Sequence, residues 1–143
     1  MTDVRKVFDD LIRFETILWA TLDTRLQAER GLTLSSFNLM LIIDATPECR
    51  VFDIAEALAI TVGGTSQAVD RLEKAGHCRR RPHPEDRRSS IIELTSEGVE
   101  TLRGAEPVFD DGLAQLVEAP LSAAALARFA NTLDELRGAA ATR

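Results

Sequence analysis

The chain has 143 residues, of which 45% are hydrophobic and 28% charged, and its formal net charge at pH 7 is −6. This length and composition fit one folded domain with its own core and exclude a disordered chain. No apolar run approaches the roughly 20 residues of a membrane span, and the N-terminus lacks a signal-peptide pattern, so we expect a cytoplasmic protein without a membrane partner. Cys49 and Cys78 are too few for a disulfide framework, which agrees with a reducing compartment.

Positive charge gathers in one window of this acidic chain. Residues 71–90 contain 7 Lys and Arg against 3 Asp and Glu, whereas residues 91–143 contain 4 against 9. Five arginines of the window lie in the run "RRRPHPEDRRSS" at residues 79–90. A polyanionic partner is therefore expected at this window and nowhere else on the surface, although charge alone leaves open a basic loop that is merely solvated.

The first predicted element is a long amphipathic helix over residues 4–26. Its apolar residues recur at steps of three and four, and Gly31 is placed to end the helix. The apolar stripe is wider than one core contact requires, which is typical of a helix that packs on two sides, as subunit-joining helices do.

Two shorter helices are predicted next. The segment "LTLSSFNLMLIIDATP" predicts a helix that Thr33 or Ser35 caps and Pro47 closes. In "VFDIAEALAIT", Asp53 is followed three residues later by a glutamate, which predicts a capping box that opens a short helix through Leu58.

A further helix is predicted over residues 62–75, with Thr61 as its N-cap and Gly76 as its end. It follows the preceding helix after only a few residues. Two short helices joined by a tight turn predict a helix-turn-helix.

A small antiparallel ribbon follows. The strand-like segments "HCRRR" and "SIIEL" flank the turn "PHPEDRRS", in which Pro82 and Pro84 restrict the backbone. A ribbon of two or three strands is too small to be stable alone, so it must pack on the helices before it.

The rest of the chain predicts two more helices. Thr95 caps the first, which runs to about Glu118 with a kink or break at Pro107, and Pro120 and Ser122 open the second. The apolar stripe of the last helix consists of Leu126, Phe129, Ala130, Leu133 and Leu136. The fold class is therefore mainly α with a small two- to three-stranded antiparallel ribbon.

Five segments in this order carry a family resemblance: "LTLSSFNLMLII", "DIAEAL", "SQAVDRLEKAGH", "RRPHPEDRR" and "IIELTSEG". Together they resemble the MarR family of bacterial winged-helix regulators. The resemblance implies a single domain over residues 1–143, with a winged helix-turn-helix lobe at 33–98 and dimerisation helices at 1–32 and 99–143. It also implies a homodimer that controls transcription, usually as a repressor, and that a small ligand or an oxidant releases from DNA.

The predicted helix over residues 62–75 is the candidate reader of double-stranded DNA. The helical period places Thr65, Ala68, Val69 and Leu72 inward. Its candidate contact residues are Gly63, Gly64, Ser66, Gln67, Arg71 and Lys74. Gln67 can pair with adenine in the major groove, with Ser66 as the second candidate, whereas Arg71 and Lys74 suit phosphates, which set register. An ordinary solvated face is the alternative.

Gly63 and Gly64 depart from the polar side chains that the family has at these positions. Each glycine costs about 1 kcal/mol relative to alanine in a helix interior, and less in a frayed first turn. Close approach of backbone amides to a phosphate would offset that cost, and a loose first turn is the alternative. Sequence discrimination is then expected to depend more on the wing and on DNA shape.

On the wing, Arg87 and Arg88 are the candidate minor-groove or phosphate contacts, and Asp86 is the candidate stabilising residue that holds an arginine in place. A solvated cluster of charges is the alternative. The three residues of 79–81 alternate sides on a strand, so at most two of these arginines point the same way.

No metal site, cofactor or catalytic centre is predicted. Zinc would require about four ligands at a recognisable spacing, and neither C-x-x-C nor H-x-x-x-H occurs, so Cys78 is interpreted as a core residue. A G-x-S-x-G elbow and a phosphate-binding Gly-rich loop are also missing from the sequence, which argues against an enzyme.

The expected effector is a small aromatic or apolar molecule, because relatives bind ligands where the first two helices meet the lobe. The residues that could line such a pocket are Phe14, Leu18, Trp19, Phe37, Met40 and Leu41. Plain core packing is the alternative for most of them. Two other functions remain open: a protein-binding helical dimer with little DNA affinity, and a metal- or thiol-responsive version of the same regulator.

Overall fold

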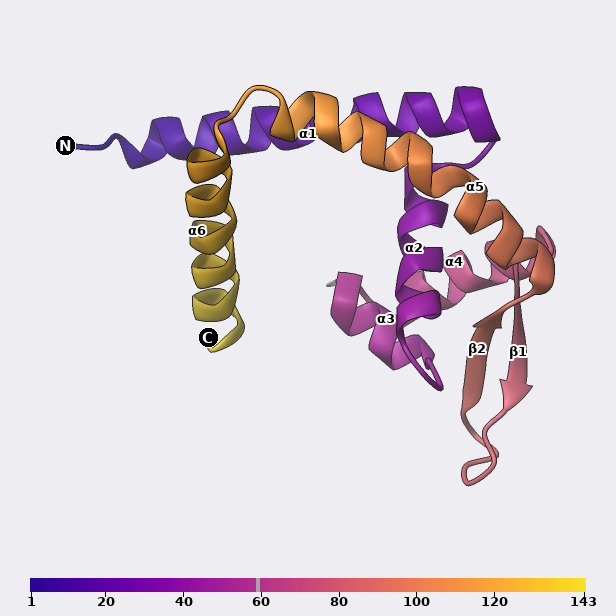
Figure 1. Cartoon of the computed structure of the whole chain (residues 1–143). Helices are drawn as coiled ribbons and strands as arrows, with labels where there is room; N and C mark the ends of the chain where they lie inside the picture. Colours follow the sequence, from indigo (N-terminus) through magenta and orange to yellow (C-terminus); the bar gives the residue numbers. More distant parts are fainter. Residues whose placement is uncertain (59) are drawn as a thin grey trace.

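The computed structural model describes residues 1–58 and 60–143. In chain order its elements are α1 (Val4–Arg30), α2 (Leu34–Ala45), α3 (Val51–Leu58), α4 (Val62–Lys74), β1 (Cys78–Pro82), β2 (Ser90–Leu94), α5 (Ser96–Leu113), the π-helical turn η1 (Ala114–Glu118) and α6 (Ala123–Ala141). Figure 1 shows α5 beside the C-terminal half of α1, with α2, α3, α4 and the β1–β2 ribbon extending to one side of this pair. The predicted fold class is confirmed.

Four predicted N-caps are confirmed. In each, a hydroxyl oxygen accepts a hydrogen bond from the backbone N–H three residues ahead, which satisfies one of the free donors at a helix start. These caps are Thr33, Thr61, Thr95 and Ser122. Gly31 and Gly76 have φ angles of 63° and 84°, the left-handed backbone that glycine tolerates best.

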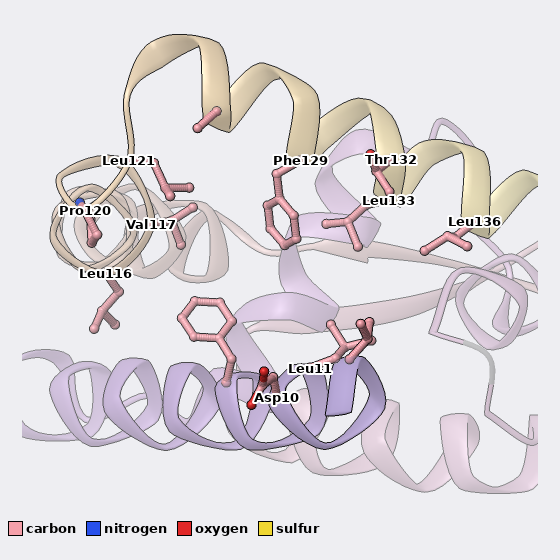
Figure 2. A pocket seen from close by; sticks show the side chains of 13 residues that line it. Asp10, Leu11, Leu116, Val117, Pro120, Leu121, Phe129, Thr132, Leu133 and Leu136 are labelled. Atoms are coloured by element: carbon pink, nitrogen blue, oxygen red, sulfur yellow. The ribbon is translucent and has the colours of Figure 1, made fainter. Parts of the chain in front are cut away.

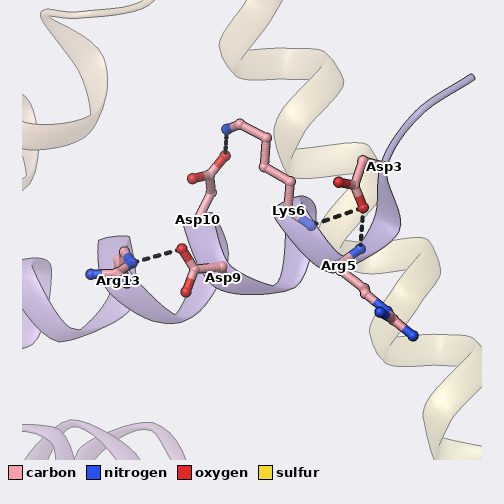
Figure 3. Close-up of polar contacts among 6 residues, drawn as sticks. All are labelled: Asp3, Arg5, Lys6, Asp9, Asp10 and Arg13. Atoms are coloured by element: carbon pink, nitrogen blue, oxygen red, sulfur yellow. Dashed lines mark hydrogen bonds and ion pairs between the residues drawn. The ribbon is translucent and has the colours of Figure 1, made fainter.

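The start of α1 has a cap that the sequence analysis did not predict. Asp3 Oδ1 accepts hydrogen bonds from the backbone N–H groups of Arg5 at 3.0 Å and Lys6 at 3.3 Å (Figure 3). One turn further, Arg13 Nε lies 2.7 Å from Asp9 Oδ2, an exposed i,i+4 pair of the kind that adds a few tenths of a kcal/mol to a helix. Local polar contacts therefore support this end of α1, which has no buried side chain.

The predicted capping box of α3 is wrong in its position. The helix begins at Val51, so Asp53 lies in the first turn rather than before it. Its Oδ2 accepts a hydrogen bond from the backbone N–H of Arg50 at 2.9 Å, which is the reciprocal half of a capping box. The other half is missing because Arg50, in the N-cap position, has no side-chain acceptor.

One buried apolar cluster joins the C-terminal part of α1 to α2, α4, α5 and the ribbon. Phe37 is its largest fully buried side chain, and its ring centroid lies 4.7 Å from that of Phe109. Leu22 and Leu26 are the buried residues of α1, and α6 has none. Within one chain, therefore, only part of the wide apolar stripe predicted for α1 is buried.

Helix α5 continues through Pro107 to Leu113, so the predicted alternative of a break at this proline is wrong. It crosses α1 at close range, because a Cβ added at Gly112 would lie 2.5 Å from Leu22 Cδ2. None of the helices in residues 1–58 and 60–143 combines the length and hydropathy needed to cross a lipid bilayer.

The ribbon consists of two antiparallel strands, β1 and β2, with Arg80 opposite Ile92. In the place where a third strand could pair there is one backbone hydrogen bond, in which the Ile92 N–H donates to the Cys49 carbonyl at 2.7 Å. At the base of the ribbon, the Thr95 N–H donates to the His77 carbonyl at 3.0 Å. These contacts hold the ribbon between the start of α3 and the start of α5.

Candidate nucleic-acid interface

Helix α4 packs one face into the core and leaves the other free, as its period predicts. Thr65, Val69 and Leu72 are buried, and Ala68 is half-buried. The exposed candidates are Gly63, Gly64, Gln67, Arg71 and Lys74, while Ser66 is half-buried. Neither Arg71 nor Lys74 forms an ion pair with any residue that the structure describes, so their charges are available to an external anion.

The two glycines at the start of α4 differ in their surroundings. A Cβ added at Gly63 would have no heavy atom of the described residues within 4 Å, whereas one added at Gly64 would lie 3.1 Å from Thr61 Oγ1. Both have ordinary helical backbones, because the positive-φ glycines are Gly31 and Gly76. Packing within the chain therefore gives no reason for glycine at position 63.

Three of the five arginines in the run 79–88 form ion pairs with carboxylates of β2 or α4. Arg79 Nε and Arg81 Nε lie 2.7 and 3.1 Å from the two carboxylate oxygens of Glu93, and the hydrogen bonds from Arg79 and then Arg81 lower the pKa of Glu93. Arg80 points to the opposite side and pairs with Asp70 and Glu73 of α4. The alternation predicted for these residues is confirmed, and it leaves none of the three unpaired.

Arg87 and Arg88 lie in the exposed turn at the tip of the ribbon. Neither side chain has an ion-pair partner within residues 1–58 and 60–143. Asp86 Oδ1 accepts a hydrogen bond from the backbone N–H of Arg88 at 3.0 Å, and the Asp86 carbonyl accepts from Ser89 N–H at 3.1 Å. Asp86 thus shapes the turn through the main chain and forms no ion pair with a guanidinium of residues 1–58 or 60–143, which leaves both arginine heads free.

His83 ties the far end of β1 to the start of α3. It is only 9% exposed, its Nε2 contacts the Arg50 guanidinium, and its Nδ1 accepts a hydrogen bond from the Glu85 N–H at 3.1 Å. The histidine therefore has a structural role in holding the ribbon, which the sequence analysis missed because Arg50 lies 33 residues earlier.

Both thiols are buried. Burial raises the pKa of Cys49 to about 11, with Asp53 adding to the shift, and burial likewise raises the pKa of Cys78 to about 11, with Glu73 adding. Such thiols stay protonated near neutral pH and lack the thiolate that reacts with oxidants or binds metals. Within the described residues no group of three His, Cys, Asp or Glu side chains is arranged to hold a metal ion.

A small apolar cavity of about 200 Å³ lies where α1, α2 and α5 meet. Leu18, Trp19 and Phe37 line it as predicted. Phe109 also lines it, although the sequence analysis did not include this residue. The predicted pocket is wrong for three other residues. Met40 is fully buried in the core, Leu41 is partly buried against the core, and Phe14 lines a different, larger groove.

That larger groove, of about 590 Å³, lies between the N-terminal half of α1 and the α6 region (Figure 2). Its walls are almost wholly apolar, and Figure 2 shows Phe129, Leu133 and Leu136 of α6 on one side with Leu11 of α1 opposite. Several large apolar side chains nearby are exposed: Val4, Val7, Phe8, Leu11, Ile12, Ile17, Leu121 and Leu136. An apolar surface of this extent is typical of an interaction site.

These features together define a winged helix-turn-helix protein, in which α3 and α4 form the helix-turn-helix and the β1–β2 ribbon is the wing. The family model of the MarR family matches residues 32–90, which run from α2 through β1 and the wing turn to the first residue of β2. The crystal structure of Sco3205, a MarR family transcriptional regulator from Streptomyces coelicolor solved in complex with DNA, is 30% identical over 99% of this chain and 91% of that one, with a TM-score of 0.84. The chain belongs to the MarR family of transcriptional regulators, which are not enzymes.

Other relatives agree with this assignment. AbsC, a MarR family regulator from Streptomyces coelicolor, shares the fold with a TM-score of 0.90 at 22% identity, over 100% of this chain and 98% of that one. The HTH-type transcriptional regulators YfiV of Bacillus subtilis and BilQ of Clostridium symbiosum are each 30% identical, over 51% and 62% of this chain. The matches span 46% and 60% of those two regulators, about half their length.

Proposed function

We propose that this chain is a sequence-specific DNA-binding regulator that acts as a homodimer on a near-palindromic operator in the cytoplasm. In this proposal it represses transcription until a small aromatic or apolar effector releases it. The observation that carries the proposal is the free face of α4 beside a wing whose tip presents two arginine heads without an internal partner in the described chain. Sco3205, at 30% identity, was solved in complex with DNA, which supports the same use of these elements here.

The two elements have separate tasks in this proposal. Gln67 and Ser66 face the base edges of the major groove, where glutamine can donate to and accept from adenine. Arg71 and Lys74 contact phosphates, while Arg87 and Arg88 reach the minor groove or the backbone beside it. Gly63 and Gly64 allow the first turn of α4 to approach the duplex without a side chain between them.

The proposed partner of the apolar groove is a second copy of this chain. Its walls are almost wholly apolar, with Asp10 and Thr132 as their polar members, which suits an apolar partner surface, and the exposed stripe of α1 continues beyond the groove. A twofold dimer would place two α4 helices in successive major grooves, about 34 Å apart. Each large side chain that the dimer buries contributes about 1.5–3 kcal/mol, which supports a stable association.

The cavity beside Trp19 is the proposed effector site. It lies between the α1–α5 stem and α2 of the lobe, so a bound molecule could favour one spacing of the two lobes over another. Its wall is mainly apolar, with Glu15 and Asn38 as its polar members, which supports an aromatic or apolar ligand. The buried, protonated thiols favour this version of the regulator over a thiol-responsive one.

Salt-dependent DNA binding tests the proposal. A duplex selected from random-sequence DNA by the wild-type chain is titrated at several salt concentrations, and log K should fall by about 0.9 per log unit of salt for each phosphate contact. Replacement of both Arg87 and Arg88 by alanine should lower the affinity for every sequence and reduce that slope. Gln67→Ala should instead weaken discrimination between the selected duplex and a scrambled one.

Arg79→Ala is the matched control, since this arginine is paired within the wing. A wild-type chain that shows no salt-dependent DNA binding would overturn the proposal and favour the protein-binding helical dimer. If DNA binding is present but neither the Arg87/Arg88 nor the Gln67 variant changes it, the assignment of these contact residues is wrong.

A further inference from the structure

Arg80 joins the wing to α4 through several contacts at once. Its Nη1 lies 2.7 Å from Asp70 Oδ1 and 3.2 Å from Glu73 Oε1, and its Nη2 donates to the Ser66 carbonyl at 3.3 Å. The backbone N–H of Arg80 also donates to Glu73 Oε2 at 3.0 Å. One residue of β1 thus contacts three residues spread over two turns of α4.

These contacts differ from those of the neighbouring arginines. Arg79 and Arg81 both pair with Glu93 of β2, so they remain within the wing. The Arg80 side chain is 24% exposed, against 67% for Arg79, so solvent screens its contacts less. A planar guanidinium that contacts several acceptors is held in one orientation, which a lysine ammonium could not reproduce.

We propose that Arg80 is a positioning residue that sets the wing at a fixed distance and angle from the recognition helix. The inference rests on the proposed DNA-binding function and extends it. With Arg80 in place, the tip residues Arg87 and Arg88 meet the DNA in register with Gln67, and the two elements bind as one rigid body. Arg80 acts on DNA binding through the tip and needs no DNA contact of its own.

A double-mutant cycle tests this dependence, because residues that act through one another are not additive. Arg80→Met keeps the length of the side chain and removes its charge and hydrogen bonds, and it should weaken binding to the selected duplex about tenfold. In that background, alanine at both Arg87 and Arg88 should change the affinity by less than about twofold, since the tip is already out of register. Losses that multiply instead would overturn the inference.

A second variant separates positioning from charge. Asp70→Asn combined with Glu73→Gln removes the two negative charges that pair with Arg80 and makes the chain less negative near the DNA. Electrostatics alone would then strengthen DNA binding, whereas loss of the Arg80 contacts should weaken it. Tighter DNA binding by this double variant would overturn the inference. The double variant also tests the inference if Arg80→Met does not fold.

Hydroxyl-radical footprinting distinguishes a misplaced wing from a general loss of stability, because a loss of stability would weaken all protected regions together. In both variants the protection of the flanking minor groove should be lost, while the central protection due to α4 remains. Arg79→Met, one residue away on the same strand, should keep both. If the wild-type chain binds no DNA, the proposed function fails; if it binds and the variants keep the flanking protection, only the role of Arg80 fails.

Discussion

At the scale of single residues, no contact within the described part of the chain explains the glycine at position 63. Its backbone is helical, and a Cβ would enter open space. Alanine would favour the helix by up to about 1 kcal/mol, less in the first turn. A residue that lowers stability without serving internal packing is typical of a surface that must approach a partner closely.

Gly63→Ala should therefore change stability and DNA binding in opposite directions. The free energy of unfolding should rise by a few tenths of a kcal/mol to about 1 kcal/mol. Affinity for the selected duplex should fall, because a methyl group would keep the first turn of α4 away from it. Urea unfolding and fluorescence anisotropy measure the two effects.

Gly104→Ala is the control, since its Cβ would meet only the Arg30 side chain, at 3.5 Å. This substitution in α5 should also raise stability and leave DNA affinity unchanged. If Gly63→Ala has no effect on DNA affinity, the glycine is simply part of a loose first turn.

At the scale of elements, the wing depends on the helices on both sides of it, as expected for a ribbon of two strands. The start of α5 approaches the base of the wing so closely that a Cβ at Gly98 would lie 1.9 Å from the His77 carbonyl oxygen. This contact is backbone against backbone and has no flexible side chain that could move aside. Gly98 therefore determines how α5 enters the junction between α4 and β1.

Gly98→Ala should lower the free energy of unfolding by about 3 kcal/mol or more, because α5 must move away from His77 and the Thr95–His77 hydrogen bond must lengthen. Urea denaturation followed by circular dichroism measures the loss, with Gly104→Ala as the comparison on the same helix. A loss below about 1 kcal/mol would mean that the junction adapts easily, contrary to the close contact described above.

Element boundaries were predicted well because their causes are local. Hydroxyl caps at Thr33, Thr61, Thr95 and Ser122 act within three residues, and the helical period reports burial directly. The start of α3 was missed by this reasoning because Asp53 accepts from the Arg50 N–H before it, as a residue of the first turn, and not from the Glu56 N–H after it, as an N-cap would. A carboxylate three residues from a glutamate fits both arrangements.

At the scale of the whole molecule, α1 and α6 carry apolar surface that one chain does not cover. The exposed residues include Phe8, Ile17 and Leu136, and the groove between the two helices is lined by Phe14 and Phe129. A twofold dimer would cover this surface and also join two weak DNA contacts into one strong one by raising their effective concentration.

Phe129→Asp should therefore convert a dimer into a monomer and lower the affinity for a palindromic duplex by at least about a hundredfold, while the affinity for a half-site stays similar. Sedimentation velocity reports the mass and anisotropy the affinity. Phe52→Asp is the control, because Phe52 is 65% exposed on α3 and far in sequence from the groove. A wild-type chain that sediments as a monomer, or a Phe129 variant that remains a dimer, would contradict the proposed assembly.

The sequence by itself determined the order of the helices, their caps and the position of the basic wing, since each depends on residues within a few positions of one another. The tertiary structure alone decided which of the five arginines remain free. Arg79, Arg80 and Arg81 find their carboxylate partners on another strand or helix, and only docking brings those partners within reach. Charge can be counted along a chain, but its neutralisation depends on distances through space, which fall to about 3 Å only in the folded molecule.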